Sequence, residues 1–97
     1  MDRGTLLGMM KDADANGYAI LSFNFFDIWD FTAIIQAAEE EKAPIMLSSI
    51  PGSFKLLTAP ICGALGTAAM KNASVQICHH LDHANTYEAC VEAINNG

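Results

Sequence analysis

The sequence predicts an α/β fold built around a parallel sheet, and two observations carry this prediction. Three short runs, at residues 18–25, 43–49 and 74–82, are nearly continuous in apolar side chains, which is typical of strands buried on both faces. Each run is followed by a segment with helical spacing. Such alternation favours parallel strands with helices packed against the sheet, either as a small doubly wound sheet or as part of a (β/α) barrel.

The first half of the chain is expected to form a helix, a strand and a second helix. Residues 5–17 have the spacing of a short helix, and residues 18–25 form the first strand. Residues 27–42 then show one apolar face at helical spacing. Asp27 is placed to cap the first turn of this helix, and Asp30 adds a negative charge near its positive end.

The next part of the chain continues with a strand and a helix. Residues 43–49 form the second strand, and "IPGS" at residues 50–53 is interpreted as a turn. Residues 58–72 form a helix, although Gly63 and Gly66 each weaken it by up to about 1 kcal/mol relative to alanine.

The last strand and helix are expected at residues 74–82 and 85–97. Asn85 and Glu88 resemble a capping box at the start of that helix. Four aromatic residues earlier in the chain are expected in the core or at an interface: Phe25, Phe26, Trp29 and Phe31.

Composition and charge exclude several classes of partner. The 97 residues are expected to form one domain, with a formal net charge of −6 and only five scattered basic residues. Nucleic acids and anionic membrane surfaces are therefore not expected as partners. The three cysteines include no Cys-x-x-Cys pair, which favours a reducing compartment. With no run resembling a signal peptide or a membrane span, we expect a cytoplasmic protein.

The stretch "CHHLDHANTYEAC", residues 78–90, holds every histidine of the chain. His79, His80 and His83 lie with Asp82 at the end of the third predicted strand, and Asn24 lies at the end of the first. In both candidate architectures, active sites form at the carboxyl ends of the strands. An imidazole there can bind zinc, and a carboxylate beside it can transfer a proton.

Structural roles for the same residues remain open at this point. His79 and His80 can be packed and hydrogen-bonded, Asp82 can cap the next helix, and Asn24 can end a strand at a turn. A third reading is an unrelated small metal-binding protein, although two histidines three apart fall short of a zinc site with three or four protein ligands.

The stretch "GYAILSFNFFDIWDFTAIIQAAEEEKAPIMLSSIPGSFK" followed by "HLDHA" resembles the class II, metal-dependent ketose-bisphosphate aldolases. The similarity spans essentially the whole chain, and "PGSFK" leans towards the tagatose-bisphosphate branch. The resemblance implies the first three β/α units of a TIM (β/α)8 barrel. It also implies the zinc-dependent, reversible cleavage of fructose or tagatose bisphosphate to dihydroxyacetone phosphate and an aldehyde.

Carried over by position, the resemblance assigns four residues. Asp82 would be the catalytic acid/base, His83 a zinc ligand, Asn24 a substrate-binding residue and His80 a supporting residue. Zinc would polarise the ketone as a Lewis acid. The full-length form would be a homo-oligomer, a dimer or a tetramer.

Two departures from the family pattern affect these expectations. Ile50 stands where the family usually has Ser or Thr, and Ser49 could replace that hydroxyl only if the strand shifted. The family's other two zinc-binding histidines and its phosphate-binding loops lie on later strands, so the chain alone is expected to be an inactive N-terminal piece. The alternative is a non-catalytic partial-barrel module that assembles with a partner or with itself.

Overall fold

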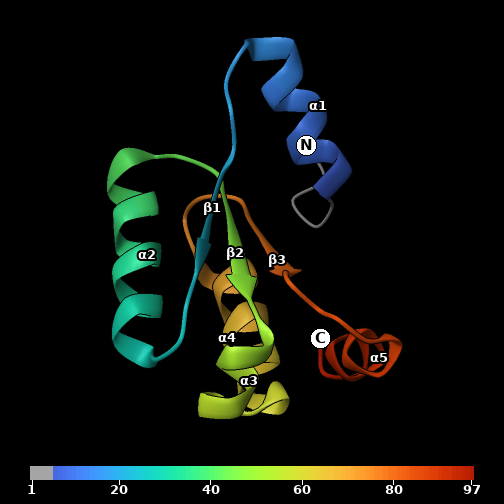
Figure 1. Cartoon of the computed structure of the whole chain (residues 1–97). Coiled ribbons are helices and arrows are strands. Elements are labelled where there is room, and N and C mark those ends of the chain that lie inside the picture. Colours follow the sequence, from blue (N-terminus) through green and yellow to red (C-terminus); the bar gives the residue numbers. More distant parts are fainter. Residues whose placement is uncertain (1–5) are drawn as a thin grey trace.

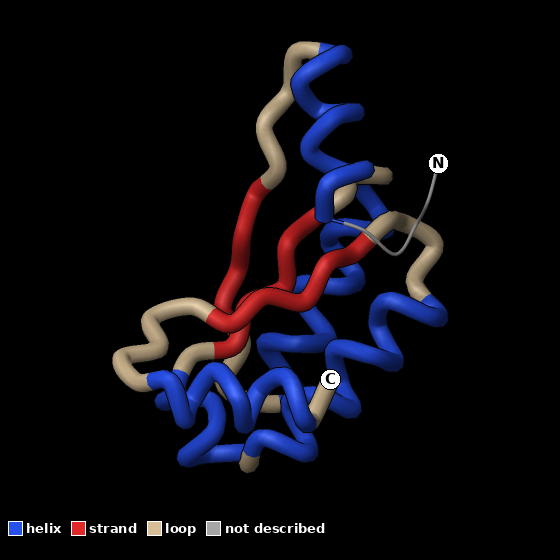
Figure 2. The backbone as a smooth tube through the Cα atoms, turned by 90° about the vertical axis from the view of Figure 1, so that its right-hand side faces the viewer, coloured by secondary structure: helices blue, strands red, loops and turns tan. Residues whose placement is uncertain are grey.

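The computed structural model describes residues 6–97, which fold as a three-stranded sheet with helices around it (Figure 1). The sheet has the order β1-β2-β3, and both pairings are parallel. Figure 2 shows the three strands running side by side. The elements are α1 (Leu6–Asn16), β1 (Leu21–Asn24), α2 (Ile28–Glu41), β2 (Ile45–Ser49), α3 (Pro51–Leu57), α4 (Ala59–Asn72), β3 (Ile77–Leu81) and α5 (Tyr87–Asn95).

The parallel sheet and the alternation of strand and helix are confirmed. β1 is shorter than expected, because its pairing with β2 begins only at Leu21 opposite Ile45. The residue before β2 is Pro44, which has no N–H to donate to a hydrogen bond between the strands. Tyr18 therefore lies outside the strand, and its hydroxyl donates to the Asp12 carboxylate at 2.5 Å.

Helix α3 occupies residues that were expected to form only a turn. Pro51 is the first residue of this helix, where its fixed φ suits the helix and its missing N–H has no cost. The Ile50 N–H donates to the Ser53 hydroxyl at 3.1 Å, which satisfies a donor at the helix start. Ser53 in turn donates to the Phe25 carbonyl at 2.8 Å and ties α3 to the end of β1.

Capping contacts set the starts of two other helices. Asp27 accepts from the N–H groups of Trp29 and Asp30, and Asp30 accepts from the Asp27 N–H, so the predicted cap of α2 is confirmed as a reciprocal capping box. At α5 the prediction was wrong by one residue. Thr86 is the cap, because its hydroxyl accepts from Ala89 N–H at 3.1 Å.

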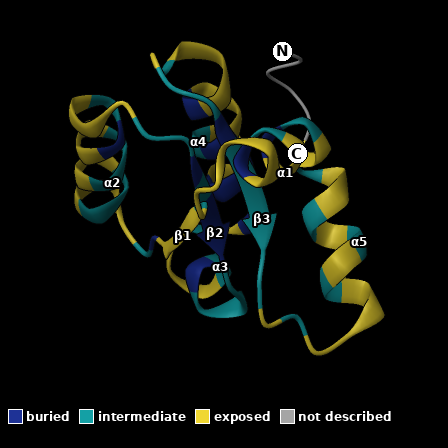
Figure 3. Ribbon diagram, turned by 90° about the horizontal axis from the view of Figure 1, so that it is seen from above, coloured by how far each residue is buried: buried dark blue, intermediate teal, exposed yellow. Residues whose placement is uncertain are grey.

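The core lies between the sheet and helices α2 and α4. Its buried residues are Phe25, Ala38, Ile45, Leu47, Cys62, Ala69 and Ile77. Figure 3 shows this burial concentrated around β2 and the inner sides of the helices. Trp29, expected in the core or at an interface, is 79% exposed and so is not in the core.

Helices α3 and α4 follow one another with only Thr58 between them. No single helix among residues 6–97 is long and apolar enough to cross a membrane. The two together reach that length and composition, but a bend of 102° separates them. Helix α4 places five buried residues against the rest of the protein: Ala59, Cys62, Gly63, Gly66 and Ala69.

The two glycines of α4 permit close approach of neighbouring elements. A side chain at Gly63 would overlap the carbonyl of Asn96, and a side chain at Gly66 would overlap the ring of His79. The helix forms as predicted, and the two glycines allow Asn96 and His79 to approach its backbone closely. The structure thus explains two residues that weaken the helix when only the sequence is considered.

His79 fills the space that Gly66 leaves open. Its Nε2 lies 2.7 Å from the Ser49 hydroxyl, and its ring lies 5.9 Å from that of Phe25. Burial lowers the pKa of His79 from its ordinary value, and the neighbouring His80 lowers the pKa further. The folded state therefore favours the neutral ring.

Gly66→Ala tests the packing at α4. On an exposed helix, alanine in place of glycine would stabilise by about 1 kcal/mol. Here the added methyl group meets His79, and we expect a loss of about 1–3 kcal/mol in the free energy of unfolding, measured by urea denaturation. Ala68→Gly, at an exposed position of the same helix, is the matched control and should cost about 1 kcal/mol. A stabilising Gly66→Ala would contradict this packing.

The half-buried His79 predicts a pH dependence of stability. Because the folded-state pKa lies below the unfolded value of 6.5, its contribution is fully present above that value and is lost as pH falls towards the folded-state pKa. We expect the unfolding free energy to fall between pH 7 and pH 5, in urea titrations at about half-unit steps. The double variant His79→Leu/Ser49→Val removes both polar partners and should flatten this slope. An unchanged slope in that variant would rule out His79 as its source.

Candidate functional site

The parallel register gathers polar side chains at the carboxyl ends of the strands. Asn24, Ser48 and His80 are register partners across β1, β2 and β3. The Asp82 N–H donates to the Ser49 carbonyl at 2.9 Å, which extends the ladder by one residue beyond β3. Asp82 lies two residues beyond His80 in the sequence, directly after the last residue of β3.

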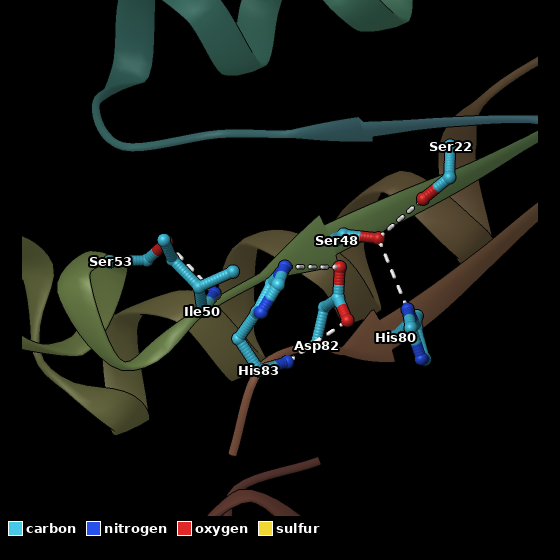
Figure 4. A network of polar contacts seen from close by, with 7 residues as sticks. All are labelled: Ser22, Ser48, Ile50, Ser53, His80, Asp82 and His83. Carbon is cyan, nitrogen blue, oxygen red and sulfur yellow. Dashed lines mark hydrogen bonds and ion pairs between the residues drawn. The ribbon is translucent and has the colours of Figure 1, made fainter. Parts of the chain in front are cut away.

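Asp82 and His83 form a pair of polar side chains at the end of β3, and His83 is exposed. Asp82 Oδ1 accepts from the His83 N–H at 2.9 Å, and Oδ2 lies 3.6 Å from His83 Nε2 (Figure 4). The side chains are 42% and 75% exposed. The expectation that Asp82 might cap the next helix is wrong, because Thr86 caps α5. The carboxylate and the imidazole are thus free to meet a ligand.

The backbone at His83 turns the chain at the end of β3. Its φ is 58°, in the left-handed region that few residues other than glycine adopt. Histidine is among the residues enriched there, but such a conformation still costs on the order of 1 kcal/mol. The turn directs the His83 side chain back over Asp82 rather than along the strand (Figure 4).

His80 belongs to a chain of hydrogen bonds on the face of the sheet opposite the helix-packed core. The Ser48 hydroxyl lies 3.3 Å from His80 Nδ1 and 2.7 Å from the Ser22 hydroxyl. His79 points to the other face, towards α4, as strand alternation requires. The expectation that both histidines are hydrogen-bonded is confirmed, and the packing contacts of the ring are found for His79.

Asn24 and Ile50 complete the strand ends. Asn24 is the last residue of β1 and is exposed. Ile50 follows β2 directly, and Ser49 does not replace its missing hydroxyl, because Ser49 is buried and bonded to His79. Ser53 has a structural role that was not predicted from the sequence. Its hydroxyl joins Ile50 N–H to the Phe25 carbonyl, a contact that no local pattern in the sequence predicts.

A small cavity of about 200 Å³ lies on the helix side of β3, between α4 and α5. His79, His80 and Leu81 border it, but most of its lining is apolar: Phe54, Ala59, Ala93 and Ile94. Asp82 and His83 do not line it. The exposed polar group at the strand ends is therefore the better candidate for chemistry.

The described residues do not by themselves fit a metal ion. No group of three or more His, Cys, Asp or Glu side chains gathers to hold one within residues 6–97. A zinc site needs three or four protein ligands. His83, exposed and next to a carboxylate, has the chemistry of one such ligand, and further ligands would have to come from elsewhere.

Comparison with known proteins identifies the family. Residues 4–97 match the family model "Fructose-bisphosphate aldolase class-II". The chain is 34% identical over 95 residues to a probable fructose-bisphosphate aldolase of Bacillus subtilis, covering 92% of this chain and 32% of that protein. It is 32% identical over 92 residues to a fructose-bisphosphate aldolase of Staphylococcus epidermidis, with the same coverage. The chain thus spans about a third of the length of these relatives.

Solved structures give the same result. The YdjI aldolase from Escherichia coli K12 superposes with a TM-score of 0.88 at 26% identity, over 97% of this chain and 37% of that one. A putative fructose-1,6-bisphosphate aldolase from Coccidioides immitis gives a TM-score of 0.83 at 28% identity, over 93% and 34% of the two chains. The chain therefore belongs to the class-II fructose-bisphosphate aldolase family.

Proposed function

We propose that the chain provides the first three β/α units of a barrel that reversibly cleaves a ketose bisphosphate. The substrate is fructose or tagatose bisphosphate, and the products are dihydroxyacetone phosphate and an aldehyde. The observation that carries this proposal is the Asp82–His83 pair at the carboxyl edge of the sheet, in a chain of the class-II aldolase family. Active sites of α/β barrels lie at this edge.

Asp82 is the proton-transfer residue in this proposal. In aldol cleavage, the hydroxyl group β to the ketone loses its proton as the carbon–carbon bond breaks, and the electron pair moves towards the ketone. A carboxylate at hydrogen-bond distance can take up or return such a proton. The bond from the His83 N–H to Asp82 Oδ1 fixes one carboxylate oxygen, and 42% of the side chain stays exposed to meet substrate.

His83 is the residue that would hold zinc in the complete site. Bound there, zinc would act as a Lewis acid on the substrate ketone. The two further histidines and the phosphate-binding loops implied by the family would lie outside residues 6–97. Asn24 would donate its amide to the substrate, and His80 would support the site from the neighbouring position of the register.

The wider setting of the protein is part of the same proposal. The partner is a phosphorylated sugar rather than a nucleic acid or a membrane, the complete enzyme is a homo-oligomer, and the compartment is the cytoplasm. The net charge of −6 and the five basic residues support only the exclusion of a nucleic acid.

A non-catalytic module is the second candidate, and the edges of the sheet favour it. Within residues 6–97, β1 and β3 each pair with β2 alone, so both outer strands have a free edge. Leu21 and Phe23 on β1 are 61% and 42% exposed. Unpaired edges and exposed apolar side chains favour assembly with another strand. Ile50, at a family Ser or Thr position, fits a module that no longer binds substrate.

A chimera tests the catalytic proposal. Residues 1–97 would be joined to the part of the Bacillus subtilis relative that lies beyond its matched segment, and cleavage of both ketose bisphosphates assayed with zinc. We expect the chimera to turn over substrate and Asp82→Asn to lower kcat roughly 100-fold or more. His83→Ala should weaken zinc binding in a calorimetric titration. Asp14→Asn, at an exposed position on α1, is the control.

Two results of this assay would count against the proposal. The first is an Asp82→Asn chimera that retains cleavage within a few-fold of the parent. The second is cleavage by the 97-residue chain alone with zinc, because the described residues hold no complete metal site.

Analytical ultracentrifugation tests the non-catalytic alternative. If the module assembles with itself, the 97-residue chain should sediment as one oligomer of defined size, and Phe23→Lys on the exposed edge strand should convert it to monomer. Trp29→Lys, also exposed but on α2, is the matched control. A stable monomer across the concentration range would rule out self-assembly.

A further inference from the structure

Ser48 is a fully buried hydroxyl at the centre of the sheet. It lies on the middle strand β2, between Asn24 on one side and His80 on the other. Its neighbours Leu47 and Ser49 face the helices, whereas Ser48 faces the opposite side of the sheet. There it meets Ser22 Oγ at 2.7 Å and His80 Nδ1 at 3.3 Å (Figure 4).

The contact determines which nitrogen of His80 remains available. A neutral imidazole has one donor and one acceptor nitrogen, and the partner of one nitrogen fixes the role of the other. A hydroxyl can accept from an N–H or donate to a bare nitrogen, so Ser48 occupies Nδ1 in either tautomer. Nε2 is then the atom left for a ligand. Ser22 occupies a second position around the Ser48 oxygen and so limits its rotation.

The pair on the other face provides a comparison within the same strands. His79 is bonded to Ser49 and is also held by Gly66 and Phe25, so packing fixes its ring even without the hydrogen bond. Both histidines are partly exposed, but His80 has neither an aromatic contact nor a glycine cradle among those described. Its orientation therefore depends more strongly on Ser48.

We propose that Ser48, braced by Ser22, is a positioning residue that holds His80 through Nδ1 and presents Nε2 to the site next to Asp82. The role in catalysis rests on the proposed function. The arrangement itself does not, because the contacts lie within this chain and need neither metal nor substrate.

Nitrogen-15 NMR of the histidine rings tests the arrangement in the 97-residue protein at about pH 8, where an ordinary imidazole is neutral. We expect Ser48→Ala to shift the Nδ1 resonance of His80 more than the Nε2 resonance, because only Nδ1 loses its hydrogen-bond partner. His79 should keep its signals in that variant. Ser49→Ala is the matched control and should change His79 while leaving His80 as it was.

Ser22→Ala provides a second test in case the Ser48→Ala variant does not fold. Ser22 is exposed on the outer strand, so its loss should leave the fold intact and shift the His80 Nδ1 resonance in the same direction, by a smaller amount. Unchanged His80 signals in both serine variants would overturn the proposal. Equal changes at His79 and His80 would also overturn it, because they would report a general loosening of the sheet.

Kinetics in the chimera test the catalytic part. Ser48→Ala should lower kcat/KM roughly tenfold, as loss of a residue that orients a site ligand does, and should have no further effect in a His80→Ala background. Additive losses would show that Ser48 does not act through His80. If the chimera cleaves no sugar bisphosphate while the His80 Nδ1 resonance shifts as expected, the positioning contact stands and the proposed function fails.

Discussion

The in-register parallel pairing of β1, β2 and β3 is the constraint on which the rest of the structure depends. It sets Asn24, Ser48 and His80 in one row and extends β3 to Asp82 through the bond to the Ser49 carbonyl. A shift of one residue would turn every side chain of a strand to the opposite face. Ser48 would then enter the apolar core, and Leu47 would replace it beside His80. The burial of apolar side chains in the core and the grouping of polar side chains at the strand ends therefore require the same register.

Strand alternation places the neighbouring residues His79 and His80 on opposite faces of the sheet. His79 is half-buried against α4, where its lowered pKa favours the neutral ring and Gly66 makes room for it. His80 lies on the other face with Ser48 and Ser22. The crowding of histidines in residues 79–83 thus has two causes. One histidine stabilises the packing of sheet on helix, and the others face the candidate site.

Much of the fold could be predicted from the sequence, because periodicity and capping act over short distances. The parallel sheet, the helix start at Asp27 and the grouping of Asn24 with His80 and Asp82 at the strand ends all follow from local patterns. Helix α3 did not, because Pro51 and Gly52 are also typical of turns. The close approaches at Gly63 and Gly66 involve residues distant in the sequence, and the hydrogen bonds of Ser48, Ser49 and Ser53 depend on tertiary contacts.

One face of the sheet is not covered by the helices α2 and α4 that form the core on the other face. Parallel sheets are normally covered on both faces, and here the face that holds Ser22 and His80 lies opposite the core formed with α2 and α4. The row of this face nearest the strand ends is polar, with Asn24, Ser48 and His80, which suits a site there. In the catalytic proposal the rest of a barrel covers it, and in the alternative a partner strand pairs with the free edge of β1. Ser48 is already buried within residues 6–97. Its contact with His80 therefore forms without the rest of a barrel or a partner strand.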